Sequence, residues 1–180
     1  AEGFEAGGHN GREETTTLCL IPAVREATTL PLIAAGGIGT GEAIFALMAL
    51  GAEGVQMGTR FALTDESSAS DIFKEYCLRL NEGDTKLLLK KLAPTRLVTN
   101  SFRDRLEAAE GRGASAEELR ELLGRGRAKK GIFEGDLEEG ELEIGQVAAL
   151  FRRRQSVDEV MKELLEGYRR ASDKIRSAGL

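Results

Sequence analysis

One histidine lies among four glycines near the start of the sequence, in the stretch GFEAGGHNG at residues 3–11. It is the sole histidine of the 180 residues. Histidine is the usual general base near neutral pH, and glycines let a ligand approach the backbone closely. His9 is therefore the candidate catalytic residue, with a purely structural histidine as the alternative. No second histidine and no cysteine cluster accompany it, so no metal site is expected.

Two more glycine clusters follow short apolar segments. PLIAAGG at residues 31–37 and GVQMGT at 54–59 each predict a strand that ends in glycine, the first of them buried on both faces. Between them, Thr40 is typical of a helix N-cap and Gly51 of a helix end. Strand, helix and strand at this spacing predict a βαβ unit. Ligands of parallel α/β folds bind at the carboxyl ends of the strands, so the three glycine clusters predict an anion site there, such as a phosphate site.

Other segments predict mainly helices. Apolar spacing favours helices at 15–29, 70–80 and 156–175; we expect Pro22 in the first turn of the first, and Leu164 and Leu165 on one side of the last. The SAEE stretch from Ser115 is typical of a capping box. Residues 91–102 are expected to be extended or irregular, and the acidic stretch 134–143 to be either a lid or a surface loop. We expect one unit at 1–68 and a mainly helical region at 69–180.

Composition narrows the function classes. The net charge of −5 argues against a nucleic-acid partner, since phosphate binding needs a clustered basic face. The longest apolar run, AIFALMAL at 43–50, is too short for a membrane span, which needs about 20 residues. Cys19 and Cys77 form no CxxC pair, so we expect small core residues, a reducing cytoplasmic compartment and no membrane association.

The three glycine-containing segments resemble a known family. GFEAGGHNG, PLIAAGGIGTGEAI and GAEGVQMGTRF are together similar to the signature segments of the FMN-dependent nitronate monooxygenases, and to those of the type II flavin-dependent enoyl-acyl carrier protein reductases, which share the fold. The resemblance is dense over residues 1–68 and looser afterwards. It implies an α/β fold: the C-terminal portion of a (β/α)8 TIM barrel, about strands 6–8, followed by a mainly helical tail. The chain is therefore expected to be a C-terminal fragment of a longer protein.

The resemblance also implies roles for individual residues around FMN. His9 matches the family's active-site histidine. Glu2 stands where many of the monooxygenases carry glutamine and the reductases often carry glutamate. The implied cofactor-binding residues are Glu2, then Gly7 and Gly8 near the isoalloxazine ring, and Gly36, Gly37, Gln56, Met57, Gly58 and Thr59 at the phosphate.

Three functions remain open on this basis. The first is oxidation of nitronates or nitroalkanes with O2. The second is NADH-dependent reduction of an enoyl thioester, and the third is a non-catalytic half-barrel fragment. Phosphate-sugar binding without redox chemistry is a further alternative. A small-molecule substrate with O2 or NADH is the expected partner set, and a homodimer is one expected assembly.

Overall fold

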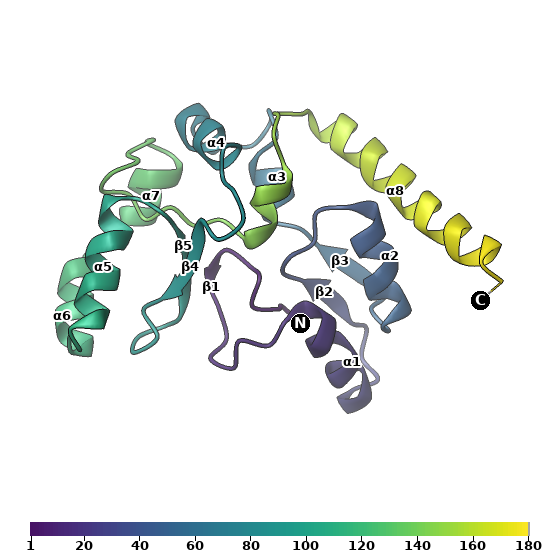
Figure 1. The fold of residues 1–180 in the computed structure, drawn as a ribbon, viewed down its shortest axis with the longest axis horizontal. Coiled ribbons are helices and arrows are strands. Elements are labelled where there is room, and N and C mark those ends of the chain that lie inside the picture. Colours follow the sequence, from purple (N-terminus) through teal and green to yellow (C-terminus); the bar gives the residue numbers. More distant parts are fainter. Residues whose placement is uncertain (180) are drawn as a thin grey trace.

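The structure, a computed structural model, describes residues 1–179. It is an α/β fold in which α5 and α6 lie at one end, α8 at the other, and the strands between them (Figure 1). The elements are, in order, β1 (Gly8–His9), α1 (Thr17–Ala27), β2 (Ile33–Ala35), α2 (Gly41–Ala49), β3 (Gly54–Gln56), α3 (Thr59–Ala62), α4 (Asp71–Cys77), β4 (Thr85–Leu88), β5 (Thr95–Val98), α5 (Ser101–Gly111), α6 (Ala116–Leu123), α7 (Arg127–Ile132), a 3-10 helix (Gln146–Leu150) and α8 (Val157–Ser177).

The predicted βαβ unit is confirmed. β2 and β3 pair in parallel, with Ala35 opposite Gln56, and α2 connects them. Glu2 forms a parallel bridge with Ala35, so a third segment runs in the same direction beside β2. The Thr40 hydroxyl accepts the N–H of Ala43, which is the predicted N-cap of α2. The three carboxyl ends therefore meet at one edge of this sheet.

α1 and α2 cover the parallel sheet with apolar side chains. The cluster includes Ile21 from α1 and Leu47 from α2, packed with Leu32, Ala34, Ile38 and Ala52. Two expectations are wrong here. Pro22 lies inside α1 and not in its first turn, because the helix begins earlier, at Thr17. Ile33 is exposed, so β2 is not covered on both faces along its whole length.

A second sheet is antiparallel and has the order β1-β5-β4. β5 is the extended form of the 91–102 region that the sequence left open. On one side, Leu97 packs with Phe102 and Leu106 of α5 and with Leu119 of α6. On the other, Val98 joins a cluster with Phe73, Cys77, Leu142 and Ile144. β5 is thus the strand on which two apolar clusters meet.

Arg96 of β5 ties the glycine-rich N-terminal segment to this second sheet. Its guanidinium is buried, with Nη2 2.6 Å from the Phe4 carbonyl oxygen and Nε 3.1 Å from that of Ala6. The guanidinium carbon also lies 4.7 Å from the centre of the Phe4 ring. Carbonyl groups and a stacked ring satisfy a buried guanidinium well. The segment before His9 is therefore held at two carbonyls and one side chain.

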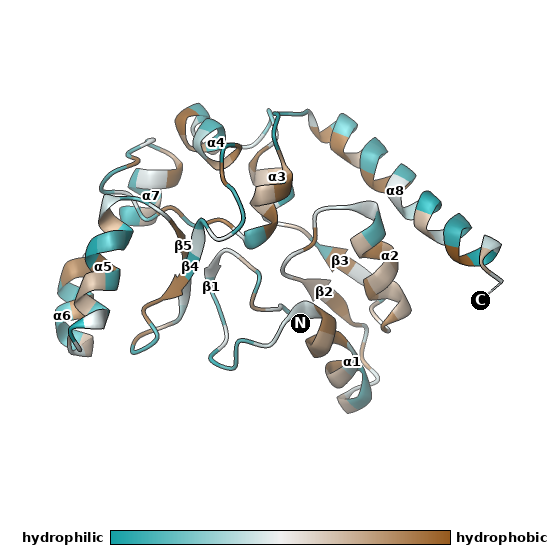
Figure 2. Ribbon diagram, in the orientation of Figure 1, coloured by the Kyte–Doolittle hydropathy of each residue, from teal (hydrophilic) through white to brown (hydrophobic). Residues whose placement is uncertain are grey.

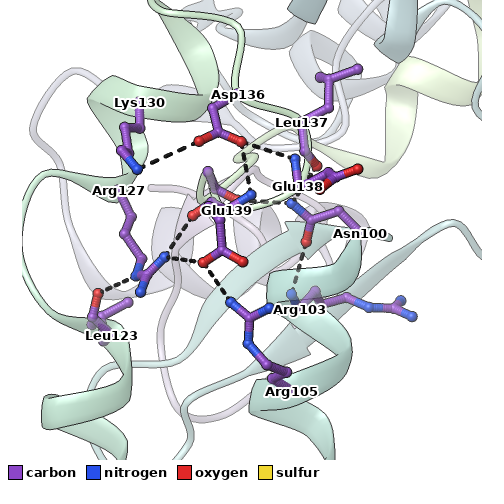
Figure 3. Close-up of polar contacts among 11 residues, drawn as sticks. Asn100, Arg103, Arg105, Leu123, Arg127, Lys130, Asp136, Leu137, Glu138 and Glu139 are labelled. Carbon is purple, nitrogen blue, oxygen red and sulfur yellow. Dashed lines mark hydrogen bonds and ion pairs between the residues drawn. The ribbon is translucent and has the colours of Figure 1, made fainter.

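The acidic stretch is fastened to its neighbours on both sides. The Asn100 amide donates to the carbonyls of Leu137 and Gly140 at 3.0 and 2.8 Å, and Arg127 donates to the carbonyl of Glu139 at 2.8 Å (Figure 3). Arg105 and Arg127 both pair with the Glu139 carboxylate. The end of the stretch is packed inside, with Glu141 only 9% exposed. Of the two alternatives, a lid and a surface loop, the surface loop is wrong for this end of the stretch, which is packed into the core.

α8 lies against α2. A capping box of Ser156 and Glu159 begins the helix as its sequence pattern suggests, and Val160 and Leu164 are buried. A Cβ at Gly41 would lie 2.0 Å from the Leu164 carbonyl oxygen, so the two helices approach closely there. Leu165, expected on the same side, is half exposed. In Figure 2, hydrophilic and hydrophobic stretches alternate along the ribbon of α8, as expected when the two kinds of residue lie on opposite faces of an amphipathic helix.

The two cysteines differ. Cys77 of α4 is buried in the apolar cluster that contains Phe73 and Val98, and burial raises the pKa of its thiol to about 12. Cys19 is exposed on α1, so the expectation of two core cysteines is wrong for it. Within residues 1–179, no helix is both long and apolar enough to cross a membrane.

Replacing Arg96 by methionine tests the tie between the two sheets. Arg96→Met leaves the Phe4 carbonyl without its donor and removes one of the two donors to the Ala6 carbonyl, so we expect the free energy of unfolding to fall by about 2–3 kcal/mol. Urea unfolding of the natural chain that contains these residues measures it. Arg153→Met is the control, because Arg153 makes only surface ion pairs and its loss should cost under about 1 kcal/mol. Equal effects of the two changes would contradict the structural role of Arg96.

The buried carboxyl group of Glu141 should make the free energy of unfolding depend on pH. Burial, with a contribution from the charge of Glu143, raises the pKa of Glu141 from 4.5 to about 7. Between these values the folded chain keeps a proton that the unfolded chain has released, so stability falls as pH rises through this window. Glu141→Gln should remove that component, on the order of 2–3 kcal/mol. Urea unfolding from pH 4.5 to 7.5 checks this, with exposed Glu134→Gln as control; an unchanged slope in Glu141→Gln would refute it.

Candidate functional site

A cavity of about 250 Å³ lies at the carboxyl ends of the parallel segments. Gly36 and Gly37 follow β2 directly, and Met57 and Gly58 follow β3. Eight of the nine predicted cofactor-binding residues line it: Glu2, Gly7, Gly36, Gly37, Gln56, Met57, Gly58 and Thr59. The structure therefore brings together residues that the sequence separates by more than fifty positions.

The loop after β2 can only be built with glycine. Gly36 has a φ of +90°, and a Cβ there would lie 2.5 Å from the Gly3 carbonyl oxygen. Gly37 has a φ of +71°. Both conformations are strained for residues with a side chain. The two glycines thus bring the turn after β2 against the backbone of the N-terminal segment.

Several backbone donors at the cavity have no partner within residues 1–179. None of the hydrogen bonds between described residues uses the N–H groups of Gly37, Gly58 or Thr59. Successive N–H groups of this kind favour an anion. The Thr59 hydroxyl accepts the N–H of Gly145 at 3.0 Å, which leaves its own proton available to a ligand.

The remaining predicted residues lie beside the cavity and do not line it. Gly8 and His9 form β1, where His9 pairs with Thr95 of β5 and its side chain is exposed. The Asn10 amide donates to the carbonyls of Ala6 and Gly8, at 3.1 and 3.0 Å, and so holds the turn before the histidine. His9 is therefore placed at the side of the cavity by a fixed loop.

Glu5 has a structural contact that the sequence did not indicate. Its carboxylate accepts the backbone N–H of Thr17 at 3.0 Å and the Thr17 hydroxyl at 3.1 Å. Thr17 begins α1, so Glu5 satisfies a free donor at that helix end. The Glu5 carboxylate is therefore part of the structure that fixes the start of α1.

The wall opposite the glycine loops comes from residues far along the chain. Glu143, Ile144 and Val147 line the cavity there. A Cβ at Gly7 would lie 2.4 Å from the carbonyl carbon of Ile144, so the two backbones touch. No motif pointed to this wall; the available signal was only the change from acidic to apolar residues near 142.

Glu143 is the titratable group of this wall. It is half-buried, and burial raises the pKa of its carboxyl, while the charge of His9 acts in the opposite direction. A Cβ at Gly8 would lie 2.6 Å from Glu143 Oε2. Among the described residues, no three His, Cys, Asp or Glu side chains gather as a metal-binding group.

Comparison with known proteins gives consistent matches. A family model described as nitronate monooxygenase matches residues 1–167. A probable nitronate monooxygenase of Staphylococcus saprophyticus is 44% identical over 114 residues, covering 57% of this chain and 32% of that protein. One from Staphylococcus aureus strain JH9 is 38% identical over 122 residues, covering 62% and 34%. The chain spans about a third of the curated relatives it matches.

Solved structures match over nearly the whole chain. FabK from Thermotoga maritima is 35% identical with a TM-score of 0.91, covering 99% of this chain and 56% of that one. A nitroalkane oxidase from Streptomyces ansochromogenes is 30% identical with a TM-score of 0.75, covering 97% and 52%. With the family model matched over most of its length, the chain belongs to the nitronate monooxygenase family.

Proposed function

We propose that this chain is the C-terminal part of an FMN-dependent oxidoreductase of the nitronate monooxygenase type, which oxidises nitronates or nitroalkanes with O2. The observation that carries the proposal is the cavity at the carboxyl ends of the parallel strands, lined by the residues that the family resemblance assigns to the flavin. The family match and the nitroalkane oxidase similarity support the reaction class.

The cavity fits the phosphate end of such a cofactor. Three free N–H groups, of Gly37, Gly58 and Thr59, and the Thr59 hydroxyl are donors suited to a dianion. A volume of 250 Å³ is below the roughly 300 to 1,000 Å³ of a whole ligand site, so it suits part of a cofactor. A Cβ at Gly58 would meet nothing within 4 Å, so there is room beside this backbone.

Different residues of this chain would have different roles in the proposed reaction. The loops after β2 and β3 hold the phosphate, and Gly7 and Gly8 allow the ring system to lie against the backbone. His9 accepts a proton from the carbon beside the nitro group at an imidazole nitrogen. Ile144 and Val147 exclude water from one wall. FMN, when bound, supplies the electron transfer between substrate and O2.

The proposal also includes the fold of the longer protein to which this chain would belong. Glu2, β2 and β3 run in parallel, as strands 6–8 of a (β/α)8 barrel would. Residues 1–68 then form the last units of the barrel and residues 69–180 the region packed on it. The coverage of 56% of FabK and 52% of the nitroalkane oxidase supports a longer whole.

A second candidate is NADH-dependent reduction of an enoyl thioester. Glu2 favours it, since the resemblance places glutamate at this position in the reductases.

The electron donor separates the two candidates. We expect the natural chain containing these residues to purify with flavin absorbance, which a nitronate bleaches without O2 and NADH does not. Anaerobic spectrophotometry with each donor measures this. Bleaching by NADH instead would favour the reductase, and absence of flavin from the purified and reconstituted protein would refute both.

Gly58→Leu tests the cavity itself. Because a Cβ there meets nothing within 4 Å and the φ of −88° suits any residue, the variant should fold normally while its side chain fills the cavity. We expect FMN affinity to fall by about 100-fold or more, roughly 2.7 kcal/mol. Flavin fluorescence titration and urea unfolding are the two measurements.

Gly111→Leu is the matched control, since its Cβ also meets nothing within 4 Å and it lies at the end of α5. It should bind FMN as the wild type does. Unchanged affinity in Gly58→Leu would place the flavin elsewhere.

A further inference from the structure

Two segments lie along one edge of β5. His9 pairs with Thr95 and Gly8 with Arg96, and Glu143 forms an antiparallel bridge with Leu97. The partners of His9 and Glu143 therefore stand two positions apart along β5. Positions two apart along a strand are separated by roughly 7 Å and belong to the same face of the sheet, within reach of long side chains.

Gly8 leaves the space between them free for the Glu143 side chain. A Cβ at Gly8 would lie 2.6 Å from Glu143 Oε2 and 3.3 Å from its carboxyl carbon. Gly8 also has a φ of +73°, so a larger residue would be strained as well as obstructed. The carboxylate thus lies directly against the residue that precedes His9.

The Glu143 carboxylate makes no hydrogen bond or ion pair within residues 1–179. His9 is the charged group that acts on it directly. A half-buried carboxylate without a partner is costly, and a nearby imidazolium or imidazole N–H relieves that cost. This geometry points to a pair.

We propose that Glu143 is a positioning residue for His9: its carboxylate accepts a hydrogen bond from one imidazole nitrogen and so turns the other toward the cavity. A second group that orients a histidine and fixes its tautomer is a common arrangement in catalysis and metal binding. This inference rests on the proposed function for its catalytic consequence, while the proximity of the two residues along β5 does not.

Most of the other charged groups nearby are engaged elsewhere. Glu141, two residues before Glu143, is the exception, because burial and the charge of Glu143 raise its pKa while Arg127 acts in the opposite direction. Arg96 donates to the carbonyls of Phe4 and Ala6, and Glu5 accepts from Thr17. Glu143 is held rigidly, since Val98 donates to the Leu142 carbonyl at 2.9 Å and Gln146 to the Glu5 carbonyl at 3.0 Å.

The first test reads the imidazole directly. In the natural chain containing these residues, NMR signals of the His9 ring, identified by their loss in His9→Gln, are followed against pH. We expect an inflection caused by ionisation of Glu143, and its disappearance in Glu143→Gln. A His9 response in Glu143→Gln identical to that of the wild type would overturn the proposal, whether or not flavin binds.

Glu141→Gln is the matched control, the same change two residues away at a side chain that does not line the cavity. Burial and the charge of His9 are the causes that act on the pKa of Glu143, and Glu141 is not among them, so the inflection should remain in this control. Loss of the inflection in this control as well would count against a specific role for Glu143.

The second test reads catalysis in the flavin-loaded protein, with whichever donor bleaches the flavin. kcat/KM should rise with pH as Glu143 ionises, and Glu143→Gln should lack this rise and lose about 10- to 100-fold at the plateau with unchanged flavin affinity. Glu143→Asp, which keeps the charge, should recover part of the rate and keep the rise. An acid limb unchanged in Glu143→Gln overturns the positioning role, whereas absence of bound flavin refutes only the proposed function.

Discussion

Burial of one arginine side chain supports the rest of the arrangement. Arg96 projects from β5 into the N-terminal segment and donates to the carbonyls of Phe4 and Ala6. That segment carries the glycines of the cavity wall and leads directly into His9. A charged group buried at 2% exposure holds its surroundings to one geometry, because each donor left without an acceptor would be costly. Arg96 therefore fixes the contact between the antiparallel sheet and the N-terminal segment, which in turn pairs with the parallel sheet at Glu2.

Glycine residues allow backbone segments to approach one another closely around the cavity. Gly36 lies against Gly3, and Gly7 against Ile144, at separations that admit no Cβ. The cavity is consequently walled by backbone on several sides. Side chains at such positions would both block the approach and fill the space that the free N–H groups face. The glycine-rich composition is in this sense a requirement of the site, and not only of its turns.

Local signals made part of this structure predictable. Thr40 caps α2, Ser115 and Ser156 form capping boxes, and the β2-α2-β3 unit has the expected register, because each depends on residues a few positions apart. The cavity residues after β2 and β3 were found for the same reason. What lay beyond prediction depends on distant partners: the exposure of Cys19 and Leu165, the burial of Arg96, and the wall at Glu143. The burial of Arg96 and the wall at Glu143 follow from how β5 pairs on both edges, which no short pattern encodes.

The cavity gains its last wall long after its first walls have been synthesised. Its first walls lie within residues 2–59, yet the N–H that engages Thr59 belongs to Gly145, 86 residues later. At about 5–20 residues per second of synthesis, roughly 4–17 seconds separate these two residues on the ribosome. During that interval the apolar surface that will meet Ile144 and Val147 stays open to solvent. Any ligand of this cavity is thus acquired late, after translation of the segment that completes it, and the interval before then is when the nascent chain most needs protection from aggregation.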